Sequence, residues 1–138
     1  MIGAALLLSV SITNASERNI CMDDQTCRAV FLVGAAAGLV KAAVHLPPDV
    51  AGKQSEAICL AVGGLDTRVS DLRDFTPEEA STEKFKSQIQ DGVARAKAYC
   101  GTIESSAVIP AQNDAEVFEI ASEIQDQVIE YLTAYHNN

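Results

Sequence analysis

The sequence predicts an all-α protein, a compact bundle of four to five helices held together by two disulfides. Three observations lead to this prediction. First, 48% of the 138 residues are apolar, many of them Ala, and there is no Trp and few aromatic residues. This composition suits closely packed helices better than sheets. Second, apolar residues recur at helical spacing in several segments. Third, an even number of cysteines follows an apolar leader, which is typical of exported, disulfide-bonded domains.

The first 15 residues are predicted to be a signal peptide. An apolar run from Ala4 to Ile12 precedes Thr13 and Ala15, whose small side chains suit cleavage after Ala15. The run is too short to span a membrane, which takes ~20 apolar residues. The three residues before it contain no Lys or Arg, so a short buried N-terminal helix is the alternative. We expect a periplasmic or secreted protein with a single helical domain, residues 16–138.

The first helix of this domain is predicted from Gln25 to Val44. It contains twelve uncharged residues, 29–40, which are enough for a buried central helix and too few for a membrane span. Gly34 and Gly38 share one face, where we expect a groove that lets another helix pack closely. Pro47 and the proline after it end the helix.

The second helix is predicted from about Val50 to Val62. Gly63-Gly64 predicts a kink or a break, beyond which the helix can resume to Leu72. The third helix is predicted to start at a Thr-Pro-Glu-Glu capping signal, residues 76–79, or to restart near Thr82. It ends at Tyr99, where the following Cys-Gly pair allows a left-handed cap.

A linker, residues 102–112, is predicted to lead to the last helix. Asn113 and Glu116 form its capping signal, and the helix runs to about Ala134. Its apolar stripe follows a 3.6-residue period and consists of Val117, Ile120, Ala121, Ile124, Val128, Tyr131 and Leu132.

Helix geometry ranks the three possible cysteine pairings. If the first two helices form an antiparallel hairpin, Cys59 lies level with Ala35. Cys27 then lies ~12 Å further along the first helix, beyond the ~7 Å that can separate the Cα atoms of a disulfide. Cys21 is further away still. The predicted disulfides are therefore Cys21–Cys27 and Cys59–Cys100.

The charge is strongly acidic and unevenly distributed. The net charge is −9, so we expect no nucleic-acid partner. Residues 111–138 contain six carboxylates and no Lys or Arg. Such a run is usually a solvated helix face; the alternative is an acidic edge that meets a basic partner. The candidate partner-binding residues are Glu116, Glu119, Glu123, Asp126 and Glu130. A basic face on the third helix, either solvated or paired with the acidic last helix, consists of Lys84, Lys86, Arg95 and Lys97.

We find no catalytic, cofactor-binding or metal-binding residues in the sequence. There is no C-x-x-C motif, and neither His45 nor His136 has neighbours at metal-ligand spacing. Two pairs of acids, Asp23-Asp24 and Glu78-Glu79, lie at predicted helix starts, where carboxylates stabilise free amides. We therefore expect a protein that is not an enzyme, needs no cofactor and acts by binding another protein, with a homodimer as a further prediction.

Three segments share a layout with a known family. A cysteine opens a glycine-containing apolar helix, Cys27–Gly34; a proline turn, Pro47-Pro48-Asp49-Val50, is followed by Gln54; and the third helix ends in Ala98-Tyr99-Cys100. This layout resembles the periplasmic immunity proteins that protect bacteria against type VI secretion amidase toxins, the Rap/Tai-like family. The resemblance covers about half of the chain. Leu46 stands where the family has a cysteine, and residues 101–138 add a helix.

The resemblance implies stoichiometric inhibition of a peptidoglycan-cleaving toxin by blocking its active site, without assigning any contact residue. A second hypothesis is an accessory structural subunit of an envelope secretion or conjugation system. It predicts oligomers and a hydrophobic patch on the last helix. A third is an acid-stress chaperone that dissociates as its carboxylates become protonated.

Overall fold

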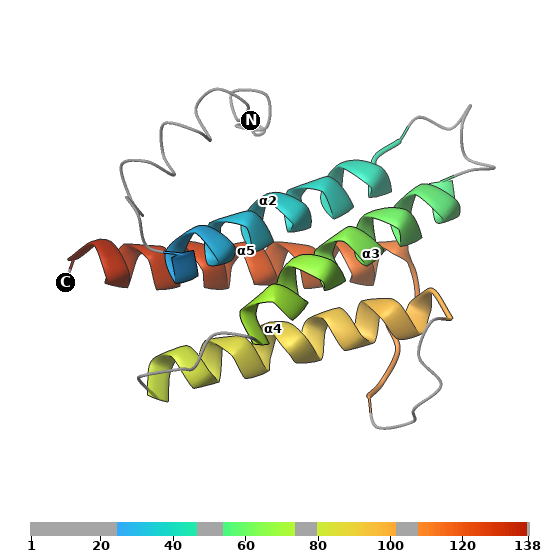
Figure 1. The fold of residues 1–138 in the computed structure, drawn as a ribbon. Helices are drawn as coiled ribbons and strands as arrows, with labels where there is room; N and C mark the ends of the chain where they lie inside the picture. Colours follow the sequence, from blue (N-terminus) through green and yellow to red (C-terminus); the bar gives the residue numbers. More distant parts are fainter. Residues whose placement is uncertain (1–24, 47–53, 74–79, 102–107, 138) are drawn as a thin grey trace.

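A computed structural model of the chain describes residues 25–46, 54–73, 80–101 and 108–137, with the backbone alone at 73, 80–82 and 135–137. These residues form four helices and no strand, so the all-α prediction is confirmed for them (Figure 1). The helices are α2 Gln25–Val44, α3 Gln54–Arg73, α4 Ala80–Tyr99 and α5 Asp114–Asn137. The predicted signal peptide, the acidic pair before α2 and the capping signal at 76–79 lie outside the described residues.

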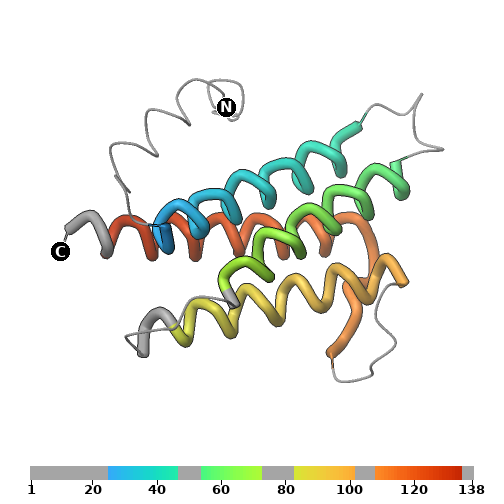
Figure 2. The backbone as a smooth tube through the Cα atoms, in the orientation of Figure 1, coloured from blue at the N-terminus to red at the C-terminus, as the bar shows by residue number. Residues whose placement is uncertain are grey.

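Each helix packs against two neighbours. α2 contacts α3 and α5, and α4 contacts the same two helices. α3 and α5 therefore lie diagonally across the bundle from each other. The tube in Figure 2 shows α2 and α3 side by side, with α4 following along the other side of α3. Because α3 and α5 are diagonal, their outer faces point to different sides of the molecule.

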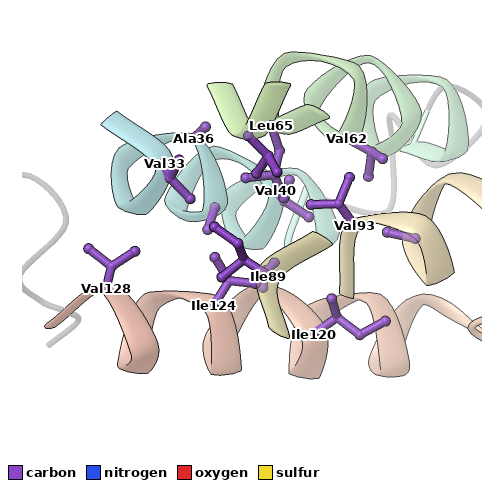
Figure 3. Packing of buried hydrophobic residues seen from close by; sticks show 14 of the residues in the cluster. Val33, Ala36, Val40, Val62, Leu65, Ile89, Val93, Ile120, Ile124 and Val128 are labelled. Carbon is purple, nitrogen blue, oxygen red and sulfur yellow. The ribbon is translucent and has the colours of Figure 1, made fainter. Parts of the chain in front are cut away.

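The core lies between the four helices and is apolar throughout the described residues. Side chains from all four helices meet there, among them Val40, Leu65, Ile89 and Ile124 (Figure 3). The predicted stripe of α5 is buried except for Tyr131, which packs at the edge of the core. Burial of these regularly spaced apolar side chains is the main force that holds the helices together.

The predicted close-packing groove on α2 is confirmed, and α5 occupies it. A Cβ on Gly34 would lie 3.0 Å from Val128 Cγ1, and one on Gly38 would lie 3.0 Å from Gln125 Nε2. The Gln125 amide fills this groove and donates a hydrogen bond to the Gly34 carbonyl at 3.1 Å. Lys41 Nζ in turn donates to Gln125 Oε1 at 3.0 Å. The polar groups in the groove therefore satisfy one another.

α2 is long and apolar enough to cross a membrane by length and composition, with a mean hydropathy of 1.7 over its best 18-residue window. The prediction that this helix is too short to span a membrane counted only the uncharged residues 29–40, whereas the 18-residue window is also apolar on average. One face of α2 is packed against α3 and α5, and eight of its residues are buried.

The predicted break of the second helix at Gly63-Gly64 is wrong, whereas the continuation to Leu72 that the sequence allowed is confirmed. α3 continues through both glycines to Arg73. Glycine costs a helix ~1 kcal/mol relative to alanine, but Ile58, Val62 and Leu65 on the inner face are all buried. A continuous helix keeps this apolar stripe in the core, and the burial outweighs the cost of the glycines.

Two predicted helix ends are confirmed. Gly101, two residues after the last residue of α4, adopts a positive φ of 76°, a conformation in which only glycine is free of steric cost. At the start of α5, Asn113 Oδ1 accepts a hydrogen bond from the Glu116 amide at 3.0 Å. Both caps satisfy backbone groups that a helix end leaves unpaired.

The predicted Cys59–Cys100 disulfide is confirmed, with an S–S distance of 2.07 Å and a Cα–Cα distance of 5.7 Å. The hairpin from which it was derived is also present, because Gln54 Nε2 donates to the Val44 carbonyl at 2.6 Å across the turn. Cys27 is fully buried and is not a free thiol. Cys21 lies outside the described residues, so its pairing with Cys27 stays a prediction.

Candidate partner-binding face

Four carboxylates form one exposed line along α5, which we call the acidic stripe: Glu119, Glu123, Asp126 and Glu130. All four are exposed. Their spacing of four, three and four residues keeps them on one helix face, and their span corresponds to ~17 Å at the helical rise. The opposite face of α5 is buried in the core. The stripe therefore points to solvent because the apolar residues of the same helix point inward.

The carboxylates of the acidic stripe have no ion pair and no side-chain hydrogen bond within the described part of the chain. Ile129 lies at the edge of the stripe and is 61% exposed. None of the described contacts uses these four charges, and mutual repulsion of like charges on one helix face is unfavourable. A partner that brings positive charge would relieve this repulsion.

Glu116, predicted to belong to the same set, has a different environment. Its side chain is ion-paired with Arg95 of α4, with Arg95 Nη2 and Glu116 Oε2 3.3 Å apart. Arg95 Nε also donates to the Ile109 carbonyl at 3.0 Å, and the Arg95 carbonyl accepts from the Ala111 amide at 3.3 Å. Glu116 thus helps to hold the segment before α5 against α4, which is a structural role.

The four basic residues of the third helix do not form one face. Arg95 pairs with α5, as one of the two interpretations expected, whereas Lys97 Nζ bonds to Asp66 of α3 at 3.1 Å. Lys84 is exposed, and Lys86 is half-buried. The helical rotation between Arg95 and Lys97, about 200° for two residues, directs them to opposite neighbours. They connect α4 to both adjacent helices.

A hydrogen bond that the sequence did not predict connects α4 to the start of α5. The Tyr99 hydroxyl donates to Asp114 Oδ1. This hydrogen bond, together with burial and the charge of Asp114, raises the pKa of Tyr99 above its usual value. Tyr99 and Asp114 are separated by a linker, so their pairing could not be read from the sequence. The sequence showed only that Asp114 is an acid in the first turn of a predicted helix.

His45 makes an aromatic contact with α5. Its ring lies edge-on to Phe118 with a centroid distance of 4.9 Å, and Lys41 Nζ lies 5.1 Å from the centre of the Phe118 ring. These contacts hold the end of α2 against α5. Among the described residues, no group of three His, Cys, Asp or Glu side chains is arranged to hold a metal ion.

Comparison of the chain with protein families, with characterised proteins and with solved structures finds no match. The resemblance to the Rap/Tai-like immunity proteins therefore stays a prediction. The acidic stripe is the candidate site that the geometry of the described residues supports.

Proposed function

We propose that this protein acts by binding a basic partner protein through the acidic stripe of α5, in the periplasm or outside the cell, and not by catalysis. The most specific form of this proposal is that the protein is an immunity protein, which neutralises a secreted cell-wall amidase by covering the active site of the amidase. The single observation that carries the proposal is the line of four exposed carboxylates on one helix that have no partner among the described residues.

Electrostatics support a binding role for the acidic stripe. Clustered charges of one sign attract an oppositely charged surface over several ångströms and raise the rate of encounter. The helix already holds the backbone of the four acidic residues in a line. Binding to a partner with a matching row of Lys or Arg therefore loses little backbone entropy in this protein. Binding of this kind weakens as salt screens the charges.

The alternative function is an accessory structural subunit of an envelope secretion or conjugation system. It predicted a hydrophobic patch on the last helix. Among the large apolar side chains of α5 that the structure describes, only Ile129 is strongly exposed. A single isoleucine is ordinary for a protein surface and does not make a patch. The immunity form is therefore the preferred proposal.

The proposal includes a second disulfide, between Cys21 and Cys27. The chain has four cysteines, two of which are Cys59 and Cys100, bonded to each other. Cys27 is not a free thiol, so Cys21 is the partner that remains within the chain. Peptide mapping without reduction should recover a peptide pair that links Cys21 to Cys27. A link from Cys21 to another chain would contradict it.

The function is tested by neutralising the acidic stripe. The stripe variant carries Glu119→Gln, Glu123→Gln, Asp126→Asn and Glu130→Gln. The control variant changes the net charge equally at exposed acids of α3 and α4, with Glu56→Gln, Asp71→Asn, Glu83→Gln and Asp91→Asn. The full chain and both variants are immobilised and exposed to periplasmic extract, and bound proteins are identified by mass spectrometry.

We expect the wild type and the control variant to retain the same basic protein and the stripe variant to lose most of it. Equal recovery by all three would contradict binding through the stripe. The recovered partner then separates the two functions: a cell-wall amidase inhibited at a one-to-one ratio supports immunity. An envelope assembly protein without hydrolase activity would support the structural alternative.

A further inference from the structure

One line of side chains on the outside of α3 lies apart from the core that the described residues form. Glu56, Leu60, Gly64 and Arg68 are spaced four residues apart, so they form one ridge along the helix. We call this the α3 ridge. All four are exposed, and Leu60 is 80% exposed. Leu60 lies in the middle of the helix, one turn before Gly64, and does not belong to the apolar core of the described residues.

The glycine of the ridge has no explanation inside the molecule either. A Cβ built on Gly64 meets nothing within 4 Å, and the same holds for Gly63. The helix is continuous there, and neither glycine has a positive φ. Glycine in an exposed helix lowers helix stability relative to alanine. What it provides is room for another chain to approach the backbone.

Along the ridge, an acid is followed by a large aliphatic side chain, a glycine and a base. Two such ridges that run in opposite directions therefore place acid opposite base and leucine opposite glycine. We infer that α3 packs against α3 of a second copy in an antiparallel, two-fold arrangement. In this register Leu60 of each copy lies over Gly64 of the other, and Glu56 of each lies opposite Arg68 of the other. A two-fold contact uses the same patch of both copies. Each ridge therefore supplies a protruding side chain, Leu60, and the space at Gly64 that receives Leu60 of the other copy.

The charges around the ridge allow this contact. Arg68 has a weak intrahelical pair with Asp71 at 3.9 Å, and their side chains are 47% and 54% exposed, so Arg68 can reach an outside carboxylate. The acidic stripe lies on α5, diagonally across the bundle from α3. The dimer contact therefore leaves the acidic stripes of both copies on surfaces away from the interface. The inference is independent of the proposed function.

The size of the ridge sets the strength expected of the contact. Leu60 is its one large apolar side chain, and the contact is a single crossing of two helices. A contact of this size belongs to the small, transient class of interfaces. We expect a dimer that forms with increasing protein concentration.

Charge reversal tests the register. In the full chain, Glu56→Arg or Arg68→Glu alone places like charges together twice in the dimer. The double variant Glu56→Arg with Arg68→Glu restores both pairs with their signs exchanged. The control is Glu83→Arg, an exposed acid on α4. Sedimentation velocity up to ~0.5 mM covers the weak affinities expected of a small interface, and circular dichroism confirms that each variant is folded.

We expect the wild type and the control to dimerise, each single reversal to weaken association about tenfold or more, and the double variant to recover it. Gly64→Gln, which fills the space for Leu60, should also give a monomer. A wild type that is monomeric throughout the concentration range would overturn the inference. So would a dimer that persists equally in both single reversals and in Gly64→Gln.

Discussion

Gly34 of α2 faces Val128 of α5 so closely that a Cβ on the glycine would lie 3.0 Å from Val128 Cγ1. Contacts of this kind explain why α5 sits deep against α2. The two helices also exchange side-chain hydrogen bonds in the same groove, through Gln125. Gly34 and Gly38 of α2 therefore leave room for side chains of α5, whereas a Cβ at Gly63 or Gly64 of α3 would meet nothing within 4 Å.

This difference predicts opposite effects of alanine. Gly64→Ala should stabilise the fold by about 0.5–1 kcal/mol, because the new Cβ meets nothing and helix propensity improves. Gly34→Ala should be less stable than Gly64→Ala by at least ~1 kcal/mol, because Val128 has to move. Urea unfolding at low protein concentration measures both. Equal stabilisation by the two alanines would show that α5 adjusts freely to the extra methyl group.

The Cys59–Cys100 disulfide closes a loop with a sequence separation of 41. The chain-entropy relation gives ~4 kcal/mol for a loop of this length. We expect the Cys59→Ala, Cys100→Ala double variant to lose about that much stability in urea unfolding. A loss well under 1 kcal/mol would mean that the bond does not constrain the unfolded chain.

The hydrogen bond from Tyr99 to Asp114 makes stability depend on pH in the alkaline range. It raises the pKa of Tyr99 in the folded protein above the value of ~10 expected when unfolded. The stabilisation is therefore complete below about pH 10 and is lost as pH rises through the raised pKa. Urea unfolding from about pH 8 to about pH 11.5 should show a steeper loss for the wild type than for Tyr99→Phe.

Tyr131→Phe is the control for this pH dependence, because Tyr131 stacks on Phe85 with a centroid distance of 4.9 Å and keeps its ring in the variant. It should follow the wild-type pH curve. If Tyr99→Phe also followed that curve, the Tyr99–Asp114 hydrogen bond would have no part in the alkaline loss of stability.

Arg95 connects α4 to both the segment before α5 and its first turn. Arg95→Ala should cost about 1–2 kcal/mol, because it removes a bond to the Ile109 carbonyl and the pair with Glu116. Glu116→Gln should cost less, about 0.5 kcal/mol, since the pair is partly solvated. Hydrogen exchange at the Ala111 amide reports on the segment directly. Unchanged exchange in Arg95→Ala would assign the stability of this segment to the burial of Ala111 and to its bond with the Arg95 backbone carbonyl, which alanine retains.

Most of the helical architecture was predictable because it follows local periodicity. The bounds of α2, the end of α4 before Gly101 and the cap at Asn113 all come from residues within a few positions of one another. The Cys59–Cys100 pairing was also predictable, since helical rise and one hairpin restrict the distances. The prediction at Gly63-Gly64 was wrong because propensity was judged without the burial of the opposite face.

Pairing between side chains was not predictable in the same way. Arg95 and Lys97 are two residues apart, yet one bonds to α5 and the other to α3. Glu116 continues the spacing of the acidic stripe but is used inside the fold. Nothing in the local pattern separates a carboxylate with a partner from one without, because the partner comes from another helix.

By itself, the sequence determined an acidic chain, the all-α fold of its described residues, several of the helix ends, and which face of the last helix carries charge. These properties depend on spacing along a single helix, and a helix repeats its geometry regardless of its surroundings. Only the tertiary structure decided which glycines are filled by a neighbour, which acids are already paired and which ridge of α3 is left open. Those are distances between helices, and they are set by how the apolar faces pack together.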